Sequence, residues 1–298
     1  MKAKDDKTAP PPLPEPLRVA VADAHTHLDM QAGTVEEALA KAASVGVTRL
    51  VQVGCDLAGS RWAAETAGAY EPVLATVALH PNEAPRLVHG DPDGWSRQGE
   101  RPAGGEAALD EALAEIDRLA ALPQVVGVGE TGLDYFRTGP EGKDAQERSF
   151  RAHIEIAKRH DRTLVIHDRE AHDDVLRVLK EEGAPARTVF HCYSGDAEMA
   201  EICAREGYYL SFAGNVTFKN AQNLRDALAV APLDLVLVET DAPFLTPAPY
   251  RGRPNAPYLI PVTLRAMAGV RNLAEEDMAE ALARNTERAF GVPGLFEG

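Results

Sequence analysis

The sequence predicts an α/β protein with a (β/α)8 TIM-barrel fold in a single domain. Short apolar runs alternate with helical patterns along most of the 298 residues, and there are eight such runs. These runs are almost continuously hydrophobic, which is typical of parallel strands buried on both faces. A chain of this length accommodates one α/β barrel. An open doubly wound sheet is the alternative, but no glycine-rich phosphate loop follows the first expected strand.

The first expected strand covers residues 19–27 and reads VAVADAHTH. The full set of expected strands is 19–27, 49–54, 73–79, 125–130, 163–167, 188–192, 208–213 and 235–240. Between them, apolar residues recur at helical spacing. The expected helices are 34–46, 58–69, 106–122, 144–160, 170–183, 196–207, 220–230 and a final helix over 271–291.

Two segments fall outside this pattern. Residues 1–17 are rich in proline and contain no apolar core, so we expect a disordered tail and place the barrel domain at residues 18–298. Residues 89–105 are rich in turn-forming residues and predict one long loop.

Composition limits the classes of function. The net charge of −15 argues against a broad basic surface that binds duplex DNA non-specifically. It does not exclude an enzyme acting on nucleic acid, because bound cations can invert the field in a cleft. The three cysteines, Cys55, Cys192 and Cys203, are odd in number and lack metal-type spacing, so we expect a reduced, cytoplasmic protein. No apolar run is long enough to span a bilayer, and we expect no membrane association.

Residues of metal-binding type fall at or just after the ends of the expected strands. They are His25, His27, His80, Glu130, His167, His191, Glu239 and Asp241. In a barrel, the carboxyl ends of all strands form one face, and that face carries the active site. Residues two apart on a strand share a face, so His25 and His27 can bind one ion together.

Four of these imidazoles, with Glu130 and Asp241, are enough ligands for two divalent ions, and Glu130 is the natural bridge. The set contains no thiolate, which argues against an iron–sulfur cluster or a closed structural zinc site. A single buried histidine is more often a satisfied core residue than a ligand. Ligand types at five strand ends nevertheless favour the metal site. The remaining histidines lie on expected loops or helices and should be at the surface: His89, His153, His160 and His172.

Several motifs, in order, resemble those of the TatD family of metal-dependent hydrolases within the amidohydrolase superfamily. They are DAHTHLD (23–29), ALHP (78–81), GETGLDY (129–135), HDR (167–169), HCYSG (191–195), ETDAP (239–243), RGRPNAP (251–257) and NTERAF (285–290). The resemblance covers about residues 20–291. It implies a TIM barrel with a two-metal site, and many members of the family are described as deoxyribonucleases or phosphodiesterases.

The resemblance also implies a distribution of ligands. The ligands of one ion are His25, His27, Glu130 and Asp241. The other ion shares Glu130 and adds His167 and His191. His80 lies where the family has a histidine near the substrate, and Glu239 becomes an acid behind the ligands or in the substrate site. The sequence departs from the family at Asp168, where a serine is usual, at Ala256, where an acid is usual, and in the longer loop 89–105.

The expected function is hydrolysis of DNA phosphodiester bonds, with exonuclease-like trimming of single strands from 3′ to 5′. A hydroxide bridging the two ions attacks phosphorus, and Asp241 is the candidate general base. His80, Arg169 and Arg251 are candidates for binding the phosphate or protonating the leaving group. Tyr135 either stacks on the substrate or packs in its loop. Trp95 either anchors its loop or stacks on a base.

Other functions stay open at this point. The same dinuclear site can hydrolyse another ester or an amide, such as the ester of a D-aminoacyl-tRNA. A catalytically silent binding scaffold is the alternative from another class. The metal can be Zn²⁺, Mn²⁺, Mg²⁺ or Co²⁺. We expect single-stranded or frayed DNA as the substrate and a monomeric protein.

Overall fold

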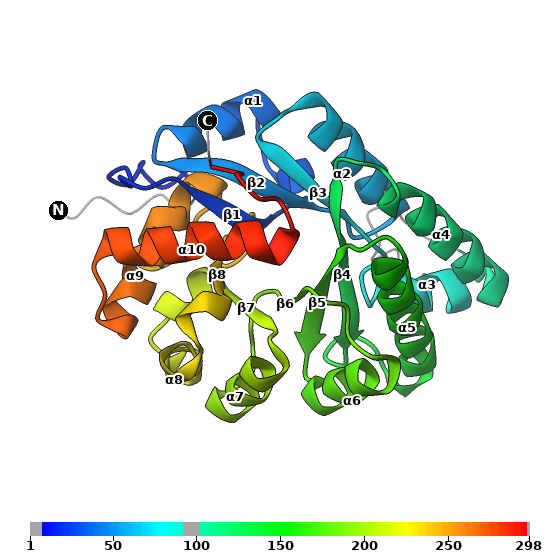
Figure 1. The fold of residues 1–298 in the computed structure, drawn as a ribbon. Coiled ribbons are helices and arrows are strands. Elements are labelled where there is room, and N and C mark those ends of the chain that lie inside the picture. Colours follow the sequence, from blue (N-terminus) through cyan, green and yellow to red (C-terminus); the bar gives the residue numbers. More distant parts are fainter. Residues whose placement is uncertain (1–7, 92–101, 297–298) are drawn as a thin grey trace. The chain divides into compact units, whose positions relative to one another are not determined.

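A computed structural model shows the predicted (β/α)8 TIM-barrel fold (Figure 1). Its eight strands are hydrogen-bonded in chain order from β1 to β8, and helices alternate with them. The structure describes residues 8–91 and 102–296. The chain divides into two compact units. Unit 1 comprises residues 1–51, 195–288 and 293–298, and unit 2 comprises residues 52–194 and 289–292. The prediction of a single domain stays a prediction.

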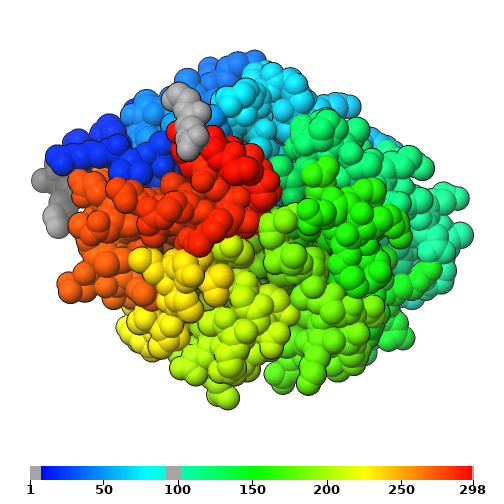
Figure 2. Space-filling model, in the orientation of Figure 1, coloured from blue at the N-terminus to red at the C-terminus, as the bar shows by residue number. Residues whose placement is uncertain are grey.

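Unit 1 contains both ends of the strand order. Its strands are β1 (Val21–Thr26), most of β2 (Val47–Val53), β7 (Tyr209–Phe212) and β8 (Val236–Val238). Its helices are η1 (Leu28–Met30), α1 (Val35–Ala43), α7 (Ala197–Glu206), η3 (Gly214–Thr217), α8 (Gln222–Val230), η4 (Leu233–Leu235), η5 (Pro257–Leu259), α9 (Ile260–Arg271) and nearly all of α10 (Glu275–Phe290). Strands β7 and β8 pair in parallel, and Thr26 forms a parallel bridge with Ala242. The carboxyl-terminal residues of this unit, coloured orange and red, lie at its surface in the view of Figures 1 and 2.

Unit 2 contains the middle of the strand order. Its strands are β3 (Val73–Val77), β4 (Val125–Asp134), β5 (Thr163–Arg169) and β6 (Thr188–Phe190), which pair in parallel. Its helices are α2 (Leu57–Ala69), α3 (Glu83–His89), α4 (Gly105–Ala120), η2 (Pro140–Gly142), α5 (Lys143–Arg159) and α6 (His172–Glu182). Helices α5 and α6 lie beside β4 and β5 (Figure 1). Within residues 8–91 and 102–296, no helix is both long and apolar enough to cross a membrane.

The observed elements differ from the predicted ones most clearly at β4, at two additional helices and at the last helix. Strand β4 does not end at Glu130 but continues to Asp134, past a register shift between Val128 and Thr131. Helices α3 and α9 were not predicted. The last helix begins at Glu275, because Asn272 adopts a left-handed conformation that ends α9.

The two segments outside the strand–helix pattern are described only in part. Residues 1–7 of the expected tail and residues 92–101 of the expected loop, with Trp95, lie outside the described residues. The described part of the tail contacts unit 1. The carbonyl oxygen of Pro11 accepts a hydrogen bond from the Tyr258 hydroxyl at 2.7 Å, and the Leu17 amide donates to the Val45 carbonyl at 3.0 Å.

His153 is a buried residue of α5, so the prediction of a surface position was wrong. Its Nε2 accepts a hydrogen bond from the Leu79 amide at 3.0 Å, and its Nδ1 lies 2.7 Å from the Ser149 carbonyl oxygen. These partners assign the proton to Nδ1 and keep the ring neutral. Burial lowers the pKa of His153 to about 4. The buried imidazole thus fastens α5 to the segment that leads from β3 to His80.

We expect acid to weaken the fold through His153. Its pKa is about 4 in the folded protein and near 6.5 when unfolded, so protonation favours the unfolded state. The stabilisation is complete above pH 6.5 and falls as the pH drops towards 4, by on the order of 3 kcal/mol in total. His153→Gln should therefore be destabilised at pH 7, and its difference from the native chain should shrink by about 2 kcal/mol at pH 5. Urea unfolding of the metal-free proteins measures this.

The matched control is His160→Gln, which removes a partly exposed histidine from the end of the same helix. A difference between His153→Gln and the native chain that stays constant from pH 7 to pH 5 would contradict the prediction.

Candidate metal centre

Four ligand-type side chains of unit 2 meet at the carboxyl ends of its strands. We call them the unit 2 cluster: His80, Glu130, His167 and His191. Glu130 lies at the middle. Its Oε1 is 3.1 Å from His80 Nε2 and 3.7 Å from His167 Nδ1, and its Oε2 is 3.2 Å from His191 Nε2. Ligand atoms of His80, Glu130 and His167 all lie within 4.8 Å of one another.

The unit 2 cluster has the chemistry of a divalent metal site. Imidazole nitrogens and one carboxylate form a donor set that suits zinc, manganese or cobalt. The side chains of Glu130 and His191 are 6% and 5% exposed, whereas those of His80 and His167 are 18–19% exposed. The residues present therefore fit a divalent metal, and His80 and His167 are the more exposed members of the cluster.

Asp134, at the end of β4, holds the unit 2 cluster in place. Its Oδ2 lies 3.3 Å from His167 Nε2 and accepts a hydrogen bond from Asn82 at 3.0 Å. Burial acts to raise the pKa of Asp134, but the contacts with His167 and Asn82 outweigh it and hold that pKa well below its usual range. A carboxylate on the far nitrogen of a metal-binding histidine fixes the ring and its tautomer. Sequence reasoning missed this role, although Asp134 belongs to the GETGLDY motif.

His80 is held in one tautomer. Its Nδ1 accepts a hydrogen bond from the Asn82 amide at 3.1 Å, so the proton is assigned to Nε2, which faces Glu130. Burial lowers the pKa of His80, and the neighbouring His167 lowers it further. His80 therefore presents an N–H group beside the carboxylate.

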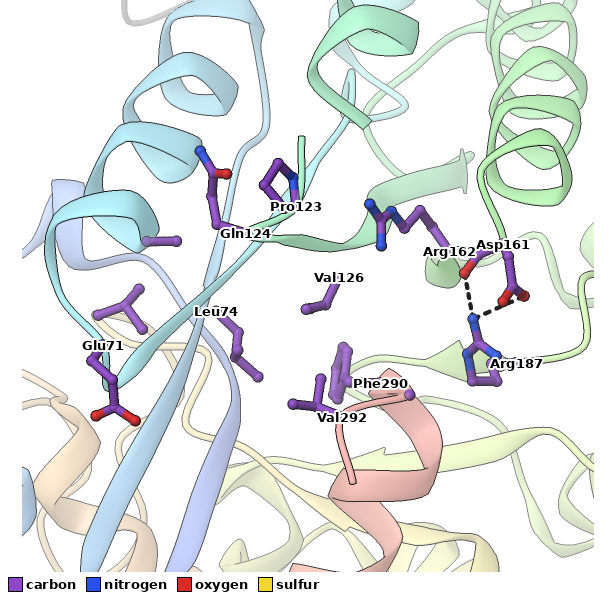
Figure 3. A pocket seen from close by; sticks show the side chains of 13 residues that line it. Glu71, Leu74, Pro123, Gln124, Val126, Asp161, Arg162, Arg187, Phe290 and Val292 are labelled. Carbon is purple, nitrogen blue, oxygen red and sulfur yellow. Dashed lines mark hydrogen bonds and ion pairs between the residues drawn. The ribbon is translucent and has the colours of Figure 1, made fainter. Parts of the chain in front are cut away.

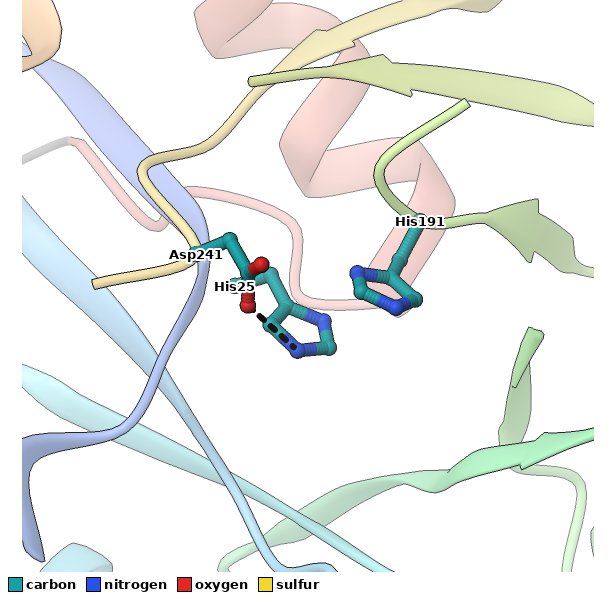
Figure 4. A group of neighbouring side chains, drawn as sticks. All are labelled: His25, His191 and Asp241. Atoms are coloured by element: carbon teal, nitrogen blue, oxygen red, sulfur yellow. Dashed lines mark ion pairs between the residues drawn. The ribbon is translucent and has the colours of Figure 1, made fainter. Parts of the chain in front are cut away.

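Unit 1 carries a second group of ligand types, which we call the unit 1 cluster: His25, His27 and Asp241. Asp241 Oδ1 is 3.4 Å from His27 Nε2 and 3.9 Å from His25 Nε2, as Figure 4 shows for His25. The backbone sets this approach, because the Asp241 amide donates to the His25 carbonyl and the His27 amide donates to the Ala242 carbonyl, each at 2.9 Å. The three side chains are chemically suited to bind one face of a divalent ion.

Asp23 fastens β1 to the segment that carries Asp241. Its buried carboxyl group accepts hydrogen bonds from the amides of His25 at 3.3 Å and Thr240 at 2.8 Å, and it also contacts the Thr240 hydroxyl. Burial raises the pKa of Asp23 to about 8, although the hydrogen bonds from Thr240 act in the opposite direction. Glu239 is fully buried in the same unit.

The residues that were predicted to contact the substrate interact with neighbouring side chains. The Tyr135 hydroxyl donates to Asp174 at 2.9 Å, and Lys143 Nζ lies 3.6 Å from the ring centroid of Tyr135. Burial, followed by the contact with Asp174, raises the pKa of Tyr135. These contacts favour packing over substrate stacking for Tyr135.

The two predicted arginines each lie over an aromatic ring. The Arg169 guanidinium lies 3.7 Å from the ring centroid of Phe136 in unit 2, and that of Arg251 lies 4.3 Å from the ring centroid of Phe218 in unit 1.

Two residues that depart from the family pattern have defined surroundings. Asp168 is buried, and its Oδ2 lies 2.7 Å from His172 Nδ1. Next to Ala256, the Asn255 side chain donates to the Thr240 carbonyl at 2.9 Å and thereby supports the segment that carries Asp241.

A pocket of unit 2, with a volume of about 460 Å³, lies at the opposite ends of the strands (Figure 3). Leu74, Val126 and Arg162 line it at or near the amino ends of β3, β4 and β5. Both arginines that line the pocket have hydrogen-bond partners within the protein. Arg162 donates to two backbone carbonyls, and Arg187 donates to Asp161. Because the pocket lies at the amino ends of these strands, it is separate from the unit 2 cluster.

Comparison with known proteins gives one consistent result. The model of a family described as TatD related DNase matches residues 22–291. The chain is 42% identical to an uncharacterized metal-dependent hydrolase, TatD, of Mycobacterium tuberculosis, over 91% of this chain and 97% of that one. It is 35% identical to the hydrolase YabD of Bacillus subtilis, over 91% and 98%. The crystal structure of YjjV, a TatD homologue from Escherichia coli, superposes with a TM-score of 0.79 at 28% identity, covering 92% of this chain and 98% of YjjV.

Proposed function

Since this chain belongs to the family of TatD-related DNases and is therefore a metal-dependent hydrolase, we propose that its substrate is single-stranded DNA. It trims this DNA from the 3′ end by hydrolysis of phosphodiester bonds. The observation that carries the proposal is the position of Glu130, whose two oxygens lie within 3.1–3.7 Å of three imidazoles.

We assign the ligands of two divalent ions. Glu130, His167 and His191 bind one ion. The other shares Glu130 and takes His25, His27 and Asp241. The resemblance of the sequence motifs supports this assignment, and so do the contacts of Glu130 with His167 and His191. The imidazole-rich set favours Zn²⁺, Mn²⁺ or Co²⁺, and the carboxylates and substrate phosphate also allow Mg²⁺.

The side chains of the protein have separate roles in the hydrolysis. When bound, the two ions lower the pKa of the attacking water and stabilise the charge that develops on the phosphate. Asp241 accepts the proton of that water at a carboxylate oxygen. The Nε2–H group of His80 binds a phosphate oxygen or protonates the leaving oxygen, and Glu239 supports the ligands from behind. Arg169 and Arg251 bind the backbone of the strand.

The net charge of −15 supports a site-directed rather than a surface-wide mode of DNA binding. A single strand or a frayed end can enter the face ringed by the loops that follow the strands, whereas a rigid duplex has to approach a closed rim. We propose a monomer that acts in the cytoplasm.

A comparison of linear and circular substrates tests the proposal. With Mn²⁺, Mg²⁺, Zn²⁺ or Co²⁺ supplied in turn, we expect stepwise shortening of a 5′-labelled linear single strand and at least about 10-fold slower cutting of blunt duplex. A covalently closed single-stranded circle should stay intact over the same time course, read on a denaturing gel. Rapid cutting of the circle would overturn trimming from an end.

Two further results would overturn the assignment of DNA as the substrate. One is turnover of a D-aminoacyl-tRNA ester without turnover of DNA. The other is a purified protein that binds no divalent metal, which would indicate a binding scaffold.

A further inference from the structure

We infer that Phe136, backed by Arg169, is a platform on which one base of the single-stranded substrate stacks. This inference rests on the proposed function. It adds a residue that determines how the strand is held, and Phe136 directly follows the GETGLDY motif.

Phe136 is unusually open for a large apolar side chain. It is 54% exposed, in the segment directly after β4, at the same strand ends as the unit 2 cluster. The guanidinium of Arg169 lies 3.7 Å from its ring centroid, at the carboxyl end of β5. This contact covers part of the ring and adds positive charge beside it. The combination of an open aromatic ring and a cation is typical of sites that bind single strands.

The position of Phe136 is fixed by backbone contacts. Asp134 Oδ1 accepts hydrogen bonds from the amides of Phe136 and Arg137, each at 3.0 Å. The Tyr135 amide donates to the Arg169 carbonyl at 3.0 Å, which ties the platform to β5. The backbone that carries the ring is therefore held in place before a substrate arrives, and Arg169 lies over the ring, so stacking needs little ordering of the protein.

The same carboxylate connects the platform with the metal ligands. While Asp134 Oδ1 holds the turn that carries Phe136, its Oδ2 lies 3.3 Å from His167 Nε2. A base held on Phe136 is thus at a fixed offset from the His167 ring. This arrangement suits a hydrolase that must place one phosphodiester bond at the metal ions while it holds a neighbouring nucleotide.

Tyr135 is the competing candidate for stacking. Its hydroxyl is bound to Asp174, and Lys143 lies 3.6 Å from its ring centroid. Tyr135 is only partly exposed, whereas Phe136 is more than half exposed. The contacts therefore favour Phe136.

A double-substitution cycle on protein and substrate tests the platform. Phe136→Ala should raise KM for an oligothymidylate by about 10-fold, since it removes the ring on which one base stacks. Single abasic sites are then placed at each position from the 3′ end. At one position, the abasic change and Phe136→Ala should each weaken binding, and together they should weaken it no more than either alone. Phe136→Trp should restore KM, and circular dichroism verifies that each variant is folded.

The control variant is Val230→Ala, which removes an apolar side chain of 45% exposure at the carboxyl end of α8. It should leave KM unchanged. If the losses from Phe136→Ala and from the abasic sites are additive at every position, Phe136 does not contact a base. If the native chain cleaves no DNA with any metal but hydrolyses an aminoacyl ester, the proposed function itself is wrong, whatever the Phe136 variants show. The two failures are therefore distinguishable.

Discussion

Glu130→Ala should purify without either metal ion and should lose at least about 10³-fold in kcat/KM on single-stranded DNA. This is the largest effect that we expect from one substitution. Glu130 is the only ligand assigned to both ions, and its oxygens lie 3.1 Å from His80 and 3.2 Å from His191. One ion is assigned to Glu130, His167 and His191. Without the negative charge of Glu130, that ion has only neutral imidazoles as ligands.

Metal analysis of the purified variants separates a shared ligand from an ordinary one. His191→Ala should lose mainly one ion, whereas Glu130→Ala loses both. Glu130→Gln keeps the shape of the side chain and removes its charge, so it should also bind metal poorly. Glu155→Gln, on the outer face of α5, should bind metal as the native chain does. Retention of two ions by a folded Glu130→Ala protein would contradict the assigned role.

The fold was predictable because one pattern repeats along the chain. Each expected strand is an apolar run. Parallel strands are buried on both faces of the sheet, so nearly all of their residues are apolar. The bounds were less predictable. Strand β4 passes Glu130 through a register shift, and no local pattern marks such an irregularity. Pro257 begins η5, and Pro261 lies in the first turn of the next helix, α9. Proline is tolerated at a helix start, yet in a sequence it suggests a break.

The candidate ligands could be selected from the sequence because they lie at or just after the ends of apolar runs. A histidine or carboxylate there must have a partner, since burial without one is costly. The residues that position them were harder to identify. Asp134 looks like an ordinary turn residue after Leu133, and only the fold shows that its carboxylate meets His167. His153 looks like a surface residue of a helix, because its partner Leu79 is far away in the sequence.

Asp241→Asn should lower kcat on single-stranded DNA by about 10²–10⁴-fold while changing KM little. Asparagine has nearly the same shape as aspartate and retains a carbonyl oxygen that can bind a metal. It cannot accept a proton from water at neutral pH. If Asp241 is the general base, its loss affects the chemical step and leaves the binding of the strand almost intact.

The structure makes this substitution a sharp test, because the backbone sets the position of residue 241. Its amide donates to the His25 carbonyl at 2.9 Å, and the neighbouring Thr240 is held by Asp23, so the segment should keep its conformation when one oxygen becomes nitrogen. Kinetics and metal content are measured together. Asp241→Ala should lose one ion as well as activity, whereas Asp234→Asn, at an exposed position before β8, should match the native chain. A kcat for Asp241→Asn within about 3-fold of the native value, with both ions bound, would show that another group takes the proton. Glu239 is then the next carboxylate to test, because it is buried in the same unit two residues away in sequence.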